Sequence, residues 1–110
     1  MKASTSRKMI KMLAKKAAIL PDDDLTIQFL PEDIKITDEF IREVLKADKI
    51  GKIDFDADLD LYVDREGISK HRRFNMLAYT VFKLSLYGTV LVVKKKEVKH
   101  ENQTYWLQFD

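Results

Sequence analysis

The sequence predicts a single α+β domain, with three helices packed on a small, mainly antiparallel sheet in the order α-β-α-β-α-β-β. Three observations predict this fold class. Residues 53–63 alternate apolar and polar side chains with the period of two that is typical of a strand. Residues 38–49 and 69–87 place apolar side chains at helical spacing, and residues 89–110 are rich in strand-forming side chains. A length of 110 residues fits one domain covering 1–110.

The first helix is expected between the N-terminus and Pro21, because the residue before a proline is pushed out of the helical region. Its apolar side chains recur at helical spacing, at Met9, Leu13, Ala17 and Leu20. The run 25–30 is bounded by aspartates and by Pro31, and it predicts a short strand.

The second helix has the clearest boundary signals in the sequence. Thr37 is a favourable N-cap, and Asp38 and Glu39 suit the positive end of the helix dipole. Gly51 can adopt the left-handed conformation that ends a helix. These signals predict a helix that begins at residue 38 and ends before Gly51.

Residues 53–63 are expected to form one strand with a buried face and an acidic face. The apolar face carries Ile53, Phe55, Ala57, Leu59, Leu61 and Val63. The opposite face carries Asp54, Asp56, Asp58, Asp60 and Tyr62.

A third helix is expected over residues 69–87 and is ended by Gly88. A β-hairpin follows, with strands 89–99 and 104–110. Residues 90–93 are apolar on both faces, which predicts a central strand that is covered on both sides.

From Ser69 to Asp110 this layout, a helix that ends in glycine and leads into a basic hairpin, resembles the recognition helix and wing of winged-helix DNA-binding domains. The resemblance implies contact with DNA through the helix and the hairpin. Winged-helix domains join their second and third helices by a turn, whereas residues 53–63 lie between them here. The chain is therefore not assigned to that family.

Charge is distributed unevenly along the chain. Residues 1–20 carry a net charge of +6, residues 21–66 carry −9, and residues 67–110 carry +5. This pattern indicates either internal ion pairs or two surfaces of opposite potential. The chain has no cysteine and no apolar run of the roughly 20 residues that a membrane helix needs, so a cytoplasmic protein without disulfides is expected.

Lys70, Arg72 and Arg73, together with His71, lie where the third helix is expected to begin. Cations are unfavourable at the positive end of a helix, so a compensating anion is expected nearby. That anion is either a bound phosphate, such as a nucleic-acid backbone, or the neighbouring carboxylates Asp60, Asp64 and Glu66.

The predicted hairpin carries a second basic group, with a tryptophan on the same sheet face. Its lysines can contact phosphates without precise geometry, and the tryptophan can stack on a base. The residues are Lys94, Lys95, Lys96, Lys99 and Trp106. The alternative is that the lysines form a solvated face and that their stems cover Trp106.

The row Asp54, Asp56, Asp58 and Asp60 has three interpretations, of which the first is a metal site. Alternate carboxylates on a strand lie roughly 6.6 Å apart, which is too far for neighbours to share one metal ion comfortably. The row can instead be a solvent face with internal ion pairs, or it can imitate nucleic-acid phosphates and bind a basic protein.

Catalytic motifs are missing from the sequence, so neither an enzyme nor a cofactor is expected. The leading hypothesis is a small regulatory protein that binds nucleic acid, with DNA favoured over RNA, through the hairpin and the start of the third helix. The alternative is a protein-binding inhibitor or adaptor that presents the acidic row to a basic partner. Self-association of basic and acidic faces is a third possibility.

Overall fold

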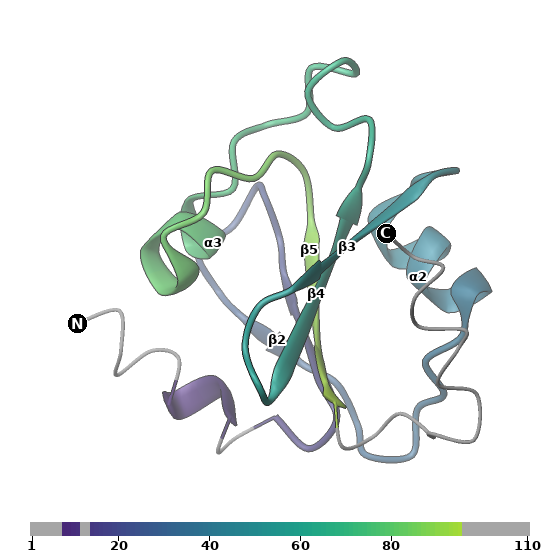
Figure 1. Ribbon diagram of the computed structural model, residues 1–110, viewed down its shortest axis with the longest axis vertical. Coiled ribbons are helices and arrows are strands. Elements are labelled where there is room, and N and C mark those ends of the chain that lie inside the picture. The colour runs from purple at the N-terminus through teal and green to yellow at the C-terminus, as the bar shows by residue number, and fades with distance from the viewer. Residues whose placement is uncertain (1–7, 12–13, 96–110) are drawn as a thin grey trace.

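The computed structural model describes residues 8–11 and 14–95 as an α+β domain built on one five-stranded antiparallel sheet (Figure 1). The strands lie in the order β2 (Gln28–Phe29), β1 (Ala17–Leu20), β5 (Val90–Lys94), β4 (Leu59–Asp64) and β3 (Ile50–Asp54). Helical structure is found at residues 8–11, in α2 (Asp38–Leu45) and in α3 (Met76–Phe82). In this part of the chain no helix is long and apolar enough to cross a membrane. The expected α+β class with an antiparallel sheet is confirmed, but the elements follow the order helix-β-β-α-β-β-α-β and not α-β-α-β-α-β-β.

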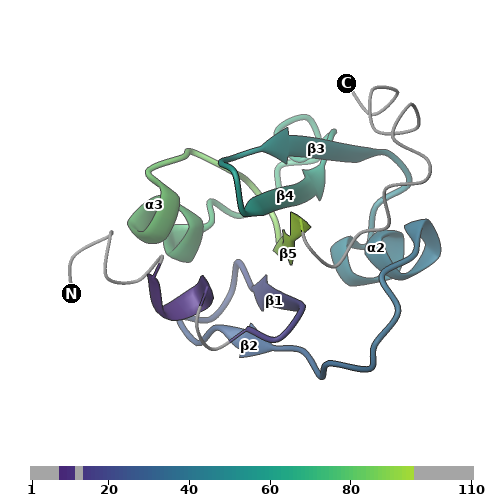
Figure 2. The ribbon, with the colours of Figure 1, turned by 60° about the horizontal axis from the view of Figure 1, so that its bottom comes forward.

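Helices α2 and α3 lie on opposite faces of the sheet, as Figure 2 shows. The α3 face is filled by side chains of α3, β4 and β5, among them Ala78, Val81, Phe82, Leu59, Leu61, Val90 and Val92. The α2 face is filled by another set, Ile41, Leu45, Tyr62, Leu91 and Val93, together with Ala17 and Ala47. Successive residues of β5 therefore enter different cores, which confirms that 90–93 form a central strand covered on both sides.

The prediction that the first helix extends to residue 20 is wrong. Residues 17–20 form strand β1 and not the last turn of that helix. Strand β1 pairs with β5 over its whole length, and Ala18 and Leu20 are fully buried. Small and apolar side chains satisfy helical spacing and a two-sided buried strand equally well, and here the tertiary pairing decides. The strand predicted at 25–30 is shorter in the structure and covers Gln28–Phe29.

Helix α2 begins where the sequence predicts. The Thr37 side chain accepts a hydrogen bond from the Phe40 backbone N–H at 3.1 Å, and Asp38 and Glu39 lie in the first turn. The helix ends earlier than expected, because Lys46 takes the left-handed conformation with φ 54°. Gly51 is therefore not the cap but a residue of β3.

Residues 53–63 are not one strand but the hairpin of β3 and β4. The Asp56 carboxylate accepts hydrogen bonds from the backbone N–H groups of Asp58 and Leu59, at 2.8 and 2.9 Å, and this closes a turn. Phe55 donates across the turn to Leu59, and three residues lie between these two. Opposite partners are then an even number of positions apart, and the alternation of faces continues through the turn unchanged.

The third helix is much shorter than the predicted 69–87. A loop at 65–73 precedes it, Phe74 forms a bridge with Tyr87, and the Asn75 side chain caps α3 by accepting from the Ala78 N–H. Lys83, with φ 60°, ends the helix. Gly88 has φ 91° in the turn before β5 and does not terminate α3.

Only the start of the predicted C-terminal hairpin, β5 (Val90–Lys94), lies within the described residues. Strand β5 is bonded to β1 on one side and to β4 on the other, so residues 91–93 have no free edge for another strand. The expected second strand, 104–110, lies outside the described residues. The winged-helix resemblance is not confirmed, because α3 is only seven residues long and β5 lies at the centre of the sheet.

Candidate functional site

The basic residues singled out in the sequence lie at two ends of the sheet. Lys70, Arg72 and Arg73 belong to the loop after Asp64, the last residue of β4. Lys94 pairs with Leu59, the first residue of β4. Leu59 and Asp64 are five steps apart along the strand, about 17 Å. The two basic groups therefore do not form one surface, and Lys96, Lys99 and Trp106 lie outside the described residues.

Asp64 organises the loop at 65–73. Its side chain is only 1% exposed, and it accepts hydrogen bonds from Lys70 Nζ at 3.2 Å and Arg72 Nε at 3.1 Å. Its other oxygen accepts from the Glu66 backbone N–H at 2.9 Å. Two of the cations predicted to contact phosphate are thus held by a carboxylate, as the alternative interpretation of this cluster required.

The pKa of Asp64 reflects these contacts. Burial alone would raise the pKa, but the hydrogen bonds from Glu66, Lys70 and Arg72 outweigh it and hold the pKa below its usual value of 3.8. Asp64 is therefore ionised at neutral pH, and the loop is built around its negative charge.

The structure adds further cations to this end of the sheet. Arg72 Nη2 donates to the Lys46 carbonyl at 2.6 Å, which ties the loop to the end of α2. Lys49 lies 3.7 Å from Glu66, and its carbonyl accepts from the Arg65 N–H at 2.9 Å. We call residues 46–49 and 64–73 the basic end. Their six basic and three acidic side chains give it a net charge of +3.

Sequence reasoning missed Lys46, Lys49 and Arg65 because they lie in the acidic third of the chain. Their proximity to Arg72 depends on the pairing of β3 with β4. Within the described residues, the exposed side chains of Arg65 and Arg73 make no hydrogen bond or ion pair, so they are available to an external anion.

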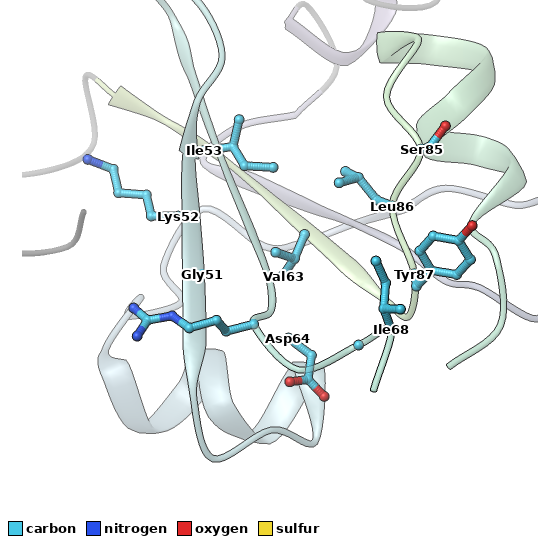
Figure 3. Close-up of a pocket in the computed structure, with 11 residues that line it drawn as sticks. Gly51, Lys52, Ile53, Val63, Asp64, Ile68, Ser85, Leu86 and Tyr87 are labelled. Carbon is cyan, nitrogen blue, oxygen red and sulfur yellow. The ribbon is translucent and has the colours of Figure 1, made fainter. Parts of the chain in front are cut away.

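A pocket of about 290 Å³ adjoins the basic end (Figure 3). Its apolar walls come from Ile53 and Val63 of the hairpin and from Leu86 and Tyr87 in the segment before β5. Ile68 of the loop is 73% exposed and completes the lining. The loop at 65–73 thus contributes both to the cationic surface and to the pocket.

Aromatic rings lie next to this pocket. Phe74 contacts Tyr87 edge-on at 5.5 Å between ring centroids, and it contacts Tyr79 at 5.9 Å. Tyr79 is 44% exposed, and Lys83 Nζ lies 5.4 Å from its ring centroid. An exposed ring beside cations is the combination that binds unpaired bases.

The acidic row is divided by the hairpin and has internal partners. Asp54 accepts a hydrogen bond from Lys95, which holds the pKa of Asp54 below its usual value. Lys11 Nζ lies 2.9 Å from Asp56 and 3.2 Å from Asp58, and both of these aspartates lie in the turn. The four carboxylates therefore do not form a bare line along one strand.

Asp60 differs from the others because it is buried. One oxygen, Oδ1, has no hydrogen-bond partner within the described residues, and it lies 3.9 Å from Lys52 Nζ and 3.8 Å from Lys95 Nζ. Burial raises the pKa of Asp60 above its usual value of 3.8, and the two lysines only partly oppose this. Asp60 is a carboxylate whose charge opposes folding.

Asp60→Asn is expected to change the free energy of unfolding at neutral pH by less than about 1 kcal/mol, because the cost of burying the charge disappears together with its ion pairs. The folded protein holds the Asp60 proton to higher pH than the unfolded chain. The stability that Asp60 contributes therefore falls as pH rises from 3.8 through the raised pKa. In Asp60→Asn, urea denaturation over this pH range should no longer show the decrease in the free energy of unfolding that Asp60 causes. A large loss of stability at neutral pH would contradict the assignment.

Other site chemistries find little support in the described residues. They contain no group of three or more acidic or histidine side chains that could hold a metal ion. Comparison of the chain with protein-family models, curated proteins and solved structures finds no match. The basic end and its pocket are therefore the candidate site on geometric grounds alone.

Proposed function

We propose that the protein binds nucleic acid, with the basic end as its contact to the phosphate backbone. The observation that carries this proposal is that the exposed Arg65 and Arg73 belong to a loop fixed by Asp64. Hydrogen bonds from Arg72 to the Lys46 carbonyl and from the Arg65 N–H to the Lys49 carbonyl join this loop to two further lysines. A pre-ordered cationic surface binds phosphates without the entropic cost of ordering the loop. A regulatory, non-enzymatic role in the cytoplasm, with DNA favoured over RNA, is the form of this function that the sequence favours.

The Lys94–Lys99 segment is retained in the proposal as a separate contact at the other end of the sheet. Lys94 is half-buried, and Lys95 is bonded to Asp54. The first lysines of the segment are thus less free than Arg65 and Arg73. We therefore assign the primary contact to the basic end.

The alternative, a basic protein partner for the acidic row, has weaker support. Asp54, Asp56 and Asp58 are each paired with a lysine, so a partner must displace an existing ion pair. The free energy that such a partner gains is only the difference between its new contacts to the aspartates and the lysine contacts that it displaces.

The test is fluorescence anisotropy with labelled DNA and RNA over a range of salt concentrations. Arg65→Gln/Arg73→Gln is expected to weaken binding at least about tenfold at low salt, because two phosphate contacts are lost. The slope of log K against log[salt] should become shallower by about 0.7–0.9 for each contact.

The matched control is Lys8→Gln/Lys35→Gln, which removes the same charge from exposed positions outside the basic end. Its salt slope should equal that of the wild type. Lys94→Gln/Lys96→Gln measures the other basic group, and a larger loss there would overturn the assignment to the basic end. No association of the wild type with DNA or RNA at low salt would overturn the function itself.

A further inference from the structure

We infer that the pocket beside the basic end receives one unpaired base, so that the ligand is a single strand and not a duplex. This inference rests on the proposed function and deepens it. A base reaches a pocket only when it leaves its stack, and a single strand pays less for that than a duplex. The location, size and lining of the pocket support the inference.

The size of the pocket suits one flat ring system. Its volume of about 290 Å³ lies just below the range for pockets that hold larger ligands, roughly 300–1,000 Å³. Figure 3 shows Ile53 and Val63 facing Leu86 across the opening, with Ile68 below them. Apolar side chains on two sides can cover both faces of a base.

Two glycines shape the pocket where it meets the basic end. A Cβ on Gly67 would lie 2.7 Å from the Tyr87 carbonyl oxygen, so the loop and the segment before β5 meet by direct backbone contact. Gly51 is in a strand, where a Cβ would lie 3.2 Å from Val63 Cγ2. Glycine inside a strand is a common sign of close approach by another group. Neither glycine fills the space with a side chain.

Polar and charged groups are placed for the rest of a nucleotide. Arg65 lines the pocket and is exposed, so a phosphate bound by Arg65 would hold its own base within reach of the apolar walls. The exposed Ser85 also lines the pocket and adds a polar residue to its lining. The charge of the basic end thus selects an anionic ligand over an apolar peptide.

The exposed ring of Tyr79 offers a second position. Its ring contacts Phe74, and the Phe74 ring also contacts Tyr87, which lines the pocket. A neighbouring base can stack there, as bases do on aromatic side chains in single-strand binding proteins. The strand would then cross from the basic end past the pocket to α3.

The experiment compares three labelled DNA ligands of equal length with the full chain. They are a thymidine single strand, the same single strand with abasic residues throughout, and a duplex. The thymidine strand should bind roughly ten- to a hundredfold more tightly than the abasic strand at one salt concentration, because only the base contacts differ. The salt slopes of these two single strands should agree, since their phosphates are the same.

Ile68→Ser tests the pocket with little risk to the fold, because Ile68 is 73% exposed. It should reduce the preference for thymidine over abasic DNA and leave abasic binding unchanged. Leu25→Ser is the matched control, since Leu25 is also 73% exposed but does not line the pocket. Its preference should equal that of the wild type.

Failure of this inference and failure of the proposed function are distinguishable. Equal, salt-dependent binding of thymidine and abasic strands would overturn the base pocket and leave the phosphate contacts intact. A preference for the duplex, or an unchanged preference in Ile68→Ser, would also overturn it. Absence of binding to all three ligands would overturn both.

Discussion

Asn75→Ala is expected to lower the free energy of unfolding by about 3 kcal/mol, the largest effect of a single polar substitution in the described structure. Asn75 is fully buried, and its amide donates to the Leu20 carbonyl at 2.8 Å and to the Gly88 carbonyl at 2.9 Å. Its oxygen accepts from the Ala78 N–H at 2.8 Å. Alanine would leave two buried carbonyls without these donors and α3 without its N-cap.

Asn75→Asp separates the cap from the two carbonyl bonds. Aspartate caps a helix as well as asparagine but cannot donate to Leu20 or Gly88. Urea denaturation should therefore show a loss in Asn75→Asp at least as large as in Asn75→Ala. Wild-type stability in Asn75→Asp would mean that the bonds to Leu20 and Gly88 contribute nothing.

The role of Asn75 could not be predicted because its partners are distant in the chain. The helical pattern placed it inside a helix over 69–87, although an asparagine before an apolar run is also an N-cap signal. Leu20 lies 55 positions away, and only the pairing of β1 with β5 brings it near. Local signals predicted α2 correctly because Thr37, Asp38 and Glu39 act within one turn.

The alternation of apolar and polar residues predicted which face of the sheet each side chain occupies, but it did not predict where the chain turns. Ile53, Leu59 and Leu61 do lie on one side of the sheet, in the core below α3. The same alternation fits one strand or a hairpin that turns between Phe55 and Leu59, and the strand pairing and the bonds to the Asp56 carboxylate decide between them. Residues 17–20 show the same limit, since four apolar side chains fit a helix end and a buried strand.

The candidate site was predicted in part. The sequence predicted a basic group at Lys70, Arg72 and Arg73, with Asp64 as one alternative partner. The structure confirms Asp64 as the partner of Lys70 and Arg72. It could not place Lys46 or Arg65 beside them, because a charge count along the chain carries no information about strand pairing. The pocket also depends on segments far apart in sequence, 51–53, 63–68 and 85–87.

Two aspartates on the same face of β4 are expected to respond to pH in opposite directions. Asp60 is buried and has ion pairs, but its Oδ1 accepts no hydrogen bond within the described residues, and its pKa is raised. The Asp64 side chain is also almost fully covered, but it is fully bonded, and its pKa is lowered. Burial raises the pKa of both carboxylates, and only Asp64 accepts the hydrogen bonds from Glu66, Lys70 and Arg72 that outweigh it.

Asp64→Asn is accordingly expected to lower the free energy of unfolding by about 2 kcal/mol at neutral pH, because charge-assisted hydrogen bonds to Lys70 and Arg72 are lost. The unfolded chain binds the Asp64 proton more readily than the folded protein does. The contribution of Asp64 is thus complete above pH 3.8 and is lost as pH falls through its lowered pKa.

Urea denaturation from neutral to acidic pH should show this acid-side loss in the wild type and a flatter profile in Asp64→Asn. Asp60→Asn is the matched control, with the same chemical change on the same strand. It should keep the acid-side loss that arises from Asp64 and lose little stability at neutral pH. Equal losses in the two variants would show that burial alone, and not the bonding of the loop to Asp64, sets the contribution of these carboxylates. The basic end would then lack the fixed loop on which its binding of phosphate depends.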